Sequence, residues 1–216
     1  FYFAALLNGE ESNLFGAIVR WGGPANQLLT LKHLDPSPPG NAILEVKLQG
    51  VTAVSHRVKV YLNTEEVGEV AFNGQSQGVF NVEIFQPALL EGDNLVTLVA
   101  QGGEMDVSLI GTLRLSYWHT YAADNDTLKL SSMGGNQLTV SGFSTPNIHV
   151  MDVTAPEAPY ELMGAINPQG LEYSVTFGVS GAGERGLFAF TDDRAKSPIG
   201  IVRNQPSSWS RFKAGY

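Results

Sequence analysis

One stretch, from His56 to Tyr117, constrains the fold more than any other, because it is a succession of strand-like runs joined by tight turns. Its first run, HRVKVYLN, alternates aliphatic residues with polar or aromatic ones, which is the pattern of a strand with one buried face. Similar runs follow at 65–75, 78–85, 95–100 and 106–118, and Asn73-Gly74 supplies residues that a hairpin turn prefers. No helical periodicity competes with these runs, so the stretch predicts an antiparallel β-sandwich.

Shorter runs extend this pattern toward the N-terminus. They lie at 1–6, 13–19, 26–34 and 42–51. The loops between them contain Gly22-Gly23-Pro24 and the sequence DPSPPGN, both of which disfavour regular structure. Together with the stretch above, they predict eight or nine strands by Tyr117, which is the number that a jelly roll uses.

The strand pattern restarts after a polar turn at Asp124-Asn125-Asp126. Seven short runs follow, with turn residues between them: TLKLSS, NQLTVSGF, IHVMDV, YELMGAI, LEYSVTFGV, GLFAFT and IGIVRN. Their spacing predicts a second, smaller, immunoglobulin-like sandwich. The chain is therefore predicted to be all-β, with two β-sandwich domains at 1–120 and 121–205.

Composition excludes several functions. The net charge of −8 repels phosphate backbones and no basic stripe interrupts it, so we expect no nucleic-acid partner. The chain has no Cys, which excludes disulfides, thiolate metal sites and a cysteine nucleophile within these residues. No apolar run reaches the roughly 18 residues of a membrane span. The chain begins at Phe1 without a signal-like leader, and we expect a mature or excised fragment.

Two sequence motifs of catalytic or cofactor sites are matched only in part. The run from Gly181 to Gly186 reads G-x-G-x-x-G, but the residues after it, LFAFT, predict a strand where a dinucleotide site needs a helix. A turn is the better interpretation. Gly178 to Ala182 misses the G-x-S-x-G elbow of hydrolases at its last position. The four His residues stand singly, so we predict packed or surface histidines and no catalytic residue in this chain.

Two groups of residues are candidates for ligand binding. Trp21, Tyr61 and Trp118 are candidates for a platform on which a glycan stacks, since aromatic rings bind the apolar face of a pyranose; core or inter-domain packing is the preferred interpretation of these rings. Asp124 and Asp126 could bind a structural Ca²⁺ through their oxygens, whereas a plain Asx-turn needs no metal. Calcium is the one cofactor that the sequence suggests.

Two sets of segments resemble known families. The segments HRVKVYLNTEEVGEVAFNGQ and ALLEGDNLVTLVA are similar to the ligand-binding, galactose-binding-like jelly rolls of secreted bacterial proteins, although Thr64 stands where that pattern usually has Gly. The segments LSYWHTYAADNDTLKL, QLTVSGF and IHVMDVTAPEAPYEL resemble the region just upstream of the catalytic domain in gingipain-like cysteine peptidases of exported bacterial proteins. In that family the peptidase domain follows a segment similar to RFKAGY. The resemblance covers the chain from about His56 to Tyr216.

This resemblance implies a non-catalytic accessory region of an exported, extracellular or cell-surface bacterial peptidase. Residues 206–216 would lead into the peptidase domain, which would be the partner of the two sandwiches in the same polypeptide. The family's catalytic His and Cys belong to that later domain, so none is carried over to a residue here. A carbohydrate- or surface-binding module is the alternative function, and an independent enzyme is a third.

Overall fold

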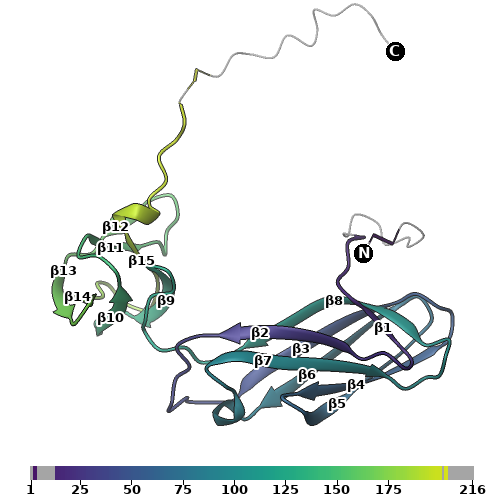
Figure 1. The fold of residues 1–216 in the computed structure, drawn as a ribbon. Helices are drawn as coiled ribbons and strands as arrows, with labels where there is room; N and C mark the ends of the chain where they lie inside the picture. The colour runs from purple at the N-terminus through teal and green to yellow at the C-terminus, as the bar shows by residue number, and fades with distance from the viewer. Residues whose placement is uncertain (1, 4–12, 201, 204–216) are drawn as a thin grey trace, which may run out of the picture. The chain divides into compact units, whose positions relative to one another are not determined.

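The computed structural model describes residues 2–3, 13–200 and 202–203, and the chain forms two compact units, Phe1–Thr120 and Tyr121–Tyr216 (Figure 1). Antiparallel strands make up most of both units. Helical structure in the described residues amounts to two single turns of 3₁₀ helix, η1 (Gln86–Ala88) and η2 (Asp192–Arg194). The prediction of an all-β chain is confirmed.

Two four-stranded antiparallel sheets form the described part of the first unit, in the orders β1-β8-β3-β6 and β2-β7-β4-β5. The strand bounds are β1 (Ile18–Arg20), β2 (Ala25–Leu31), β3 (Ala42–Gly50), β4 (Ser55–Leu62), β5 (Glu65–Asn73), β6 (Gln77–Ile84), β7 (Gly92–Ala100) and β8 (Val107–Ser116). The strand count agrees with the sequence, and the assignment to a jelly roll stays a prediction.

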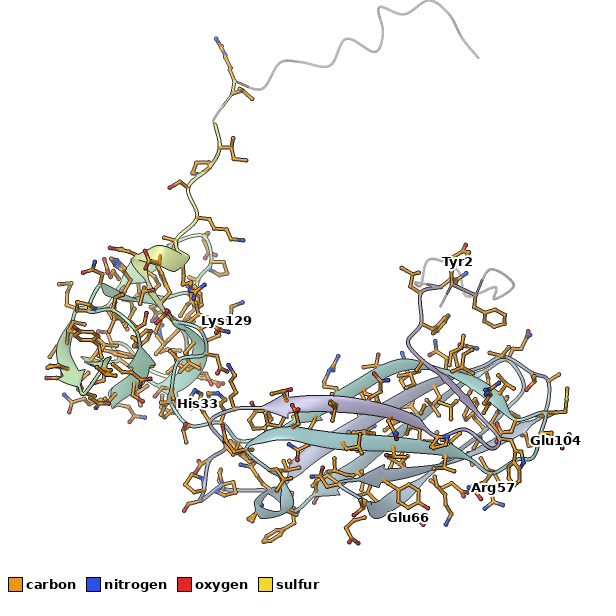
Figure 2. All side chains as sticks on the ribbon, in the orientation of Figure 1. Tyr2, His33, Arg57, Glu66, Glu104 and Lys129 are labelled. Atoms are coloured by element: carbon orange, nitrogen blue, oxygen red, sulfur yellow. The ribbon has the colours of Figure 1, made fainter. Side chains whose placement is uncertain are left out.

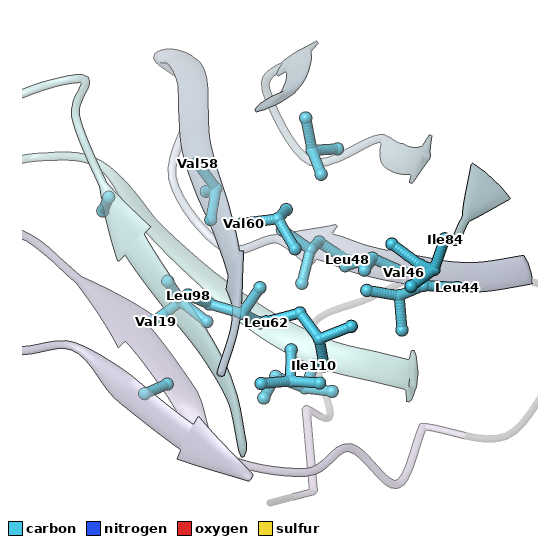
Figure 3. Packing of buried hydrophobic residues seen from close by; sticks show 14 of the residues in the cluster. Val19, Leu44, Val46, Leu48, Val58, Val60, Leu62, Ile84, Leu98 and Ile110 are labelled. Carbon is cyan, nitrogen blue, oxygen red and sulfur yellow. The ribbon is translucent and has the colours of Figure 1, made fainter. Parts of the chain in front are cut away.

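The core of the first unit lies between these two sheets. Strand β3 belongs to one sheet and β4 to the other, and each buries every second side chain against the opposite sheet (Figure 3). The buried members of these two strands include Leu44, Val46, Leu48, Val58, Val60 and Leu62. Each such aliphatic side chain stabilises the fold by about 1.5–3 kcal/mol relative to leaving it exposed. The alternation that the sequence shows therefore marks the core face correctly.

The hairpin between β4 and β5 carries local strain. Its two turn residues, Asn63 and Thr64, have φ values of 48° and 79°. Two successive left-handed residues are what a type I′ hairpin turn requires, and glycine is preferred at the second of them. A β-branched residue in that conformation is an outlier, so Thr64 costs stability where the resembling pattern has Gly.

Seven further strands form the described part of the second unit, in the orders β10-β14-β13 and β12-β11-β15-β9. Their bounds are β9 (Thr127–Met133), β10 (Gln137–Phe143), β11 (Ile148–Asp152), β12 (Tyr160–Glu161), β13 (Gly164–Gln169), β14 (Glu172–Gly178) and β15 (Glu184–Thr191). Residues from both sheets share one core, which includes Phe143, Val150, Phe177 and Leu187. This is a second, smaller β-sandwich, and its immunoglobulin-like type stays a prediction.

Two predicted strands differ from the structure, and a third lies mostly outside the described residues. The run IGIVRN is not a strand in its described part, because Ile199 and Val202 are fully exposed and have no sheet face to bury. The run YELMGAI divides into β12 and the beginning of β13. Most of the run at 1–6 and all of 206–216 lie outside the described residues. Among the described residues, no helix has the length and apolar character needed to cross a membrane.

Candidate functional site

The three aromatic residues predicted to form one platform lie apart in the first unit. Trp21 follows β1, whose last residue pairs with the first residue of β8, and Trp118 lies just beyond the other end of β8. A strand rises about 3.3 Å per residue, so roughly 30 Å separate the two positions. Tyr61 is on β4 in the other sheet, where its hydroxyl donates to Glu66 Oε2 at 3.3 Å. The structure does not bring these rings together.

Trp118 nevertheless borders a surface hollow of about 220 Å³. The hollow is lined by Asn41, Ile43, Ser116, Tyr117 and Trp118. Ile43 and Trp118 are each 47% exposed, which is high for apolar side chains of this size. The strand register places Ser116, Ile43 and Glu83 in one row across β8, β3 and β6. Asn41 Nδ2 donates to Glu83 Oε2 at 3.0 Å. Two apolar surfaces thus lie beside a hydroxyl, an amide and a carboxylate.

A buried glutamine holds the backbone of Trp118 in place. Gln86 is 2% exposed, and its Oε1 accepts a hydrogen bond from the Trp118 backbone N–H at 2.6 Å. Its Nε2 donates to the carbonyl oxygens of Trp118 and Asp35, at 2.8 Å and 3.1 Å. The Asp35 N–H also donates to the Trp118 carbonyl at 2.9 Å. The side-chain amide acts as a neighbouring strand would, so the exposed indole projects from a fixed backbone.

The segment ALLEGDNLVTLVA has a structural role that its sequence does not reveal. The Glu91 carboxylate accepts the backbone N–H groups of His33 at 2.7 Å and Leu34 at 3.0 Å. Hydrogen bonds from Leu34 and then His33 lower the pKa of Glu91 below its ordinary value. Gly92 has φ of +95°, a conformation that favours glycine. These residues fix the loop before β7 to the loop after β2.

Asn94 completes this arrangement from a fully buried position. Its Oδ1 accepts the Leu90 backbone N–H at 2.9 Å and an Asn63 Nδ2 hydrogen at 2.8 Å, while its Nδ2 donates to the Leu90 carbonyl at 2.8 Å. Asn63 Oδ1 in turn accepts the Leu95 N–H at 2.9 Å. The motif therefore joins the β4–β5 turn to the start of β7. The contacts of this segment hold loops together, which is a structural role.

A buried His–Asp pair in the first unit connects β4 to the loop before β8. His56 Nδ1 lies 2.7 Å from Asp106 Oδ1, and both side chains are fully buried. His56 Nε2 faces the carbonyl oxygens of Gly74 at 3.0 Å and Thr52 at 3.2 Å. Since all partners of the ring are acceptors, all three contacts are hydrogen bonds only when both nitrogens carry protons. The pair is closed to solvent, so it serves the fold and not a substrate.

In the second unit, Asp124 and Asp126 flank a tight turn. Asp124 and Thr127 exchange backbone hydrogen bonds of 2.9 Å and 3.2 Å, and Asn125 and Asp126 both have positive φ. The Asp126 carboxylate accepts the Ser144 N–H at 2.6 Å and its hydroxyl at 2.9 Å. Burial acts to raise the pKa of Asp126, but these bonds, with Arg194 at 3.6 Å, outweigh it and lower the pKa.

Backbone hydrogen bonds and the Ser144 contacts hold this turn. Among the described residues, no group of three or more His, Asp or Glu side chains is arranged to hold a metal ion. The Asp126 oxygens are already engaged by Ser144 and Arg194. The calcium site at Asp124 and Asp126 stays a prediction that these contacts do not favour.

The first half of the glycine-rich run, residues 181–183, is a turn, as predicted, and residues 184–186 already belong to β15. Gly181 and Gly183 have φ of +87° and +73°, and they connect β14 to β15. The next residues form a strand and not a helix, so the helix N-terminus that a dinucleotide site requires is missing here.

Two polar networks of the second unit escaped the sequence analysis. Asp152 is 1% exposed, and its Oδ2 accepts Arg185 Nε at 2.9 Å and the Tyr160 hydroxyl at 3.0 Å. Burial acts to raise the pKa of Asp152, yet hydrogen bonds from Thr154 and Arg185 lower it to about 2. The second network surrounds His149. The residues of each network lie far apart in the sequence, so no local motif predicts either network.

Comparisons with known proteins bear on the fold. No protein-family model matches the chain, and no curated protein matches it in sequence. Dimeric latent PorU from Porphyromonas gingivalis is similar in structure, with a TM-score of 0.58 and 12% sequence identity, over 89% of this chain and 20% of that one. This chain thus spans about a fifth of the length of its structural neighbour. A Paenibacillus cycloisomaltooligosaccharide glucanotransferase aligns at a TM-score of 0.33 and 7% identity, over 79% of this chain and 41% of that one, too weakly to inform the fold.

Proposed function

We propose that this chain is a non-catalytic accessory region that supports or orients a peptidase domain in the same exported bacterial polypeptide. The observation that carries the proposal is the likeness to latent PorU, which spans 89% of this chain and only a fifth of the PorU chain. It is supported by the resemblance of the segments around LSYWHTYAADNDTLKL to the region upstream of a gingipain-like peptidase domain. A place at the cell surface or outside the cell belongs to the same proposal.

The composition agrees with a non-catalytic role. A thiolate nucleophile requires a cysteine, and the chain has none. The buried His56–Asp106 pair cannot reach a substrate in this structure, because both side chains are fully enclosed. The peptidase activity would therefore reside in another domain of the polypeptide.

The proposal is tested in the polypeptide from which this chain comes. Deleting residues 1–120, 121–205 or both should reduce the secreted yield or activity of the peptidase domain, while the isolated chain should cleave no peptide. A reading frame that encodes no peptidase domain beside this chain would contradict the proposal. So would peptide cleavage by the isolated chain that a single substitution in it abolishes.

Carbohydrate binding is a second candidate function, favoured by the hollow beside Trp118. A pyranose has an apolar face and a polar rim, and here an indole and an isoleucine lie beside Ser116, Asn41 and Glu83. The Gln86 contacts fix the Trp118 backbone in advance, which lowers the entropy lost on binding. In this second candidate function the glycan stacks on one ring, that of Trp118, and not on a platform of three rings.

A glycan array with the intact chain, followed by calorimetry on any hit, tests this candidate. Trp118→Ala should reduce affinity at least tenfold, whereas Trp21→Ala should leave it unchanged, because Trp21 lies at the other end of β8. Binding that survives Trp118→Ala, or that Trp21→Ala removes equally, would separate the glycan from this hollow. Absence of binding across the array would leave packing as the role of both rings.

A further inference from the structure

His149, on the outer face of the second unit, lies between two carboxylates from different segments. Its Nδ1 is 2.6 Å from Glu161 Oε1 on β12, and its Nε2 is 2.6 Å from Asp192 Oδ1 on η2. On β15, Phe190 is its register partner and stacks on the imidazole, with ring centroids 5.4 Å apart. One imidazole on β11 therefore connects β12, an edge strand, to η2.

The charged groups around this ring are few and can be named. Glu161 comes from β12 and Asp192 from η2, and β15 contributes the uncharged Phe190 ring. Nearby charges are directed elsewhere, since Arg185 binds Asp152 and Arg194 binds Asp126. Among the described residues, Glu161 and Asp192 are the charged groups in contact with the imidazole.

The geometry requires a doubly protonated ring. A neutral imidazole has one N–H donor, and its other nitrogen is an acceptor. Whichever nitrogen loses its proton, one carboxylate then faces a lone pair, so either β12 or η2 loses its side-chain hydrogen bond to His149, while the backbone pairing of β12 with β11 remains. We propose that His149, Glu161 and Asp192 form a pH-dependent clasp, which holds β12 and η2 on β11 while the imidazole is charged and loosens them when it is neutral.

The direction of the pKa agrees with this arrangement. Hydrogen bonds that the His149 ring donates to Glu161 and, to a smaller extent, to Asp192 raise the pKa of His149 above its ordinary 6.5. The clasp is therefore closed at and below pH 6.5 and opens as the pH rises through the raised value. The side chains of His149, Glu161 and Asp192 are 35%, 46% and 59% exposed, so solvent and salt weaken both contacts.

Opening would be local. Backbone hydrogen bonds that hold η2, from Asp192 N to Asn147 O and from Ala195 N to Asp192 O, do not depend on the imidazole. The described residues after η2, from Ala195 onward, are exposed. Loss of the side-chain contact therefore loosens η2 beside an exposed segment, while its backbone hydrogen bonds remain and the sandwich stays folded. The clasp is a property of the second unit and does not depend on the accessory function proposed above.

Hydrogen exchange of the whole chain at pH 6.0 and 8.5, corrected for the intrinsic pH dependence of exchange, tests the clasp. We expect the amides of β12 and η2 to lose protection by about two- to five-fold at the higher pH, the size expected for exposed charge pairs. Asp192→Asn should remove this response at η2 alone, and Glu161→Gln at β12 alone. Asp193→Asn is the matched control, because it removes the same charge from the same turn without touching His149.

An NMR titration of the His149 ring in wild type, Glu161→Gln and Asp192→Asn gives an independent readout. A midpoint above 6.5 that falls on either carboxylate substitution supports the clasp. A midpoint at or below 6.5 would overturn it. The same pH response of β12 and η2 in wild type, Glu161→Gln and Asp192→Asn would overturn it as well.

Discussion

In the first unit, most of the polar groups described above as holding loops are buried, with Glu91 as the exposed exception, whereas in the second unit many such groups lie at the surface. Gln86, Asn94 and the His56–Asp106 pair are all within 2% of full burial. The His149 clasp is about one-third to three-fifths exposed, and Asp152 is the buried exception, paired with a partly exposed Arg185. Buried polar contacts are costly to break and little screened, while exposed ones are weak and respond to pH and salt.

This contrast predicts that the two units fail under different conditions. Mutation should damage the first unit most, because an unpaired buried group loses hydration without compensation. Changes in pH should act first on the second unit, whose contacts are charged. Four substitutions test the contrast.

The largest effect is expected from Asp106→Ala. It leaves the His56 ring and the N–H groups of Arg57 and Gly102 without their buried partner, and should reduce the free energy of unfolding by about 3–5 kcal/mol. Denaturant unfolding measures the loss, and hydrogen exchange should locate it in the first unit. Asp93→Ala, which removes one exposed contact with Thr30, is the control and should cost less than about 1 kcal/mol. Equal losses would refute the distinction between buried and exposed contacts.

Gln86→Ala should come next, at roughly 2–3 kcal/mol, because it leaves the N–H and carbonyl of Trp118 without their side-chain partner. The exposed Trp118 indole should also become more mobile, which fluorescence anisotropy detects. Gln75→Ala is the control, since it removes one exposed hydrogen bond to Val51. If both variants unfold at the same denaturant concentration, the glutamine does not hold the Trp118 backbone.

Asp152→Asn tests the buried exception in the second unit. A carboxyl pKa lowered from 3.8 to about 2 stabilises the fold above pH 3.8, and this contribution is lost as the pH falls from there through about 2. We expect the variant to be less stable than wild type by roughly 1–2 kcal/mol at pH 5, after allowance for solvent near Arg185. Unfolding at pH 2 should show the difference largely gone. A difference that stays constant between pH 5 and 2 would mean that the charge is not responsible.

The smallest effect is a gain. Thr64→Gly should stabilise the first unit by about 0.5–1 kcal/mol, because glycine adopts φ of 79° without strain. Thermal unfolding measures it. Thr112→Gly, in the middle of β8, should instead destabilise by about the same amount. Destabilisation by both would show that the turn tolerates its threonine without strain.

The sequence predicted much of this fold because strand patterns are local. The alternation of Val58, Val60 and Leu62 identified both β4 and its buried face, and the turn predicted at GAGERG is present at residues 181–183. The prediction failed in the described part of IGIVRN, where Ile199 and Val202 are exposed and belong to no strand. Periodicity shows which side chains a strand would bury, but it does not show whether another strand pairs with it.

The candidate site was predicted less well. Trp118 was singled out, but Trp21 and Tyr61 were grouped with it although they lie at the other end of β8 and in the other sheet. Gln86 was not foreseen, since its partners Trp118 and Asp35 are 32 and 51 residues away. Whether a side chain holds a backbone segment in place depends on partners that are distant in the sequence.

By itself, the sequence determined that the chain is all-β, which residues face inward on most strands, and that no thiol chemistry takes place in it. These properties follow from the two-residue period of a strand and from composition. Only the tertiary structure decided which strands pair, which loops meet and which charges become neighbours. His56 reaches Asp106, and His149 reaches Glu161 and Asp192, because sheet pairing depends on the packing of the whole sandwich and not on any local pattern.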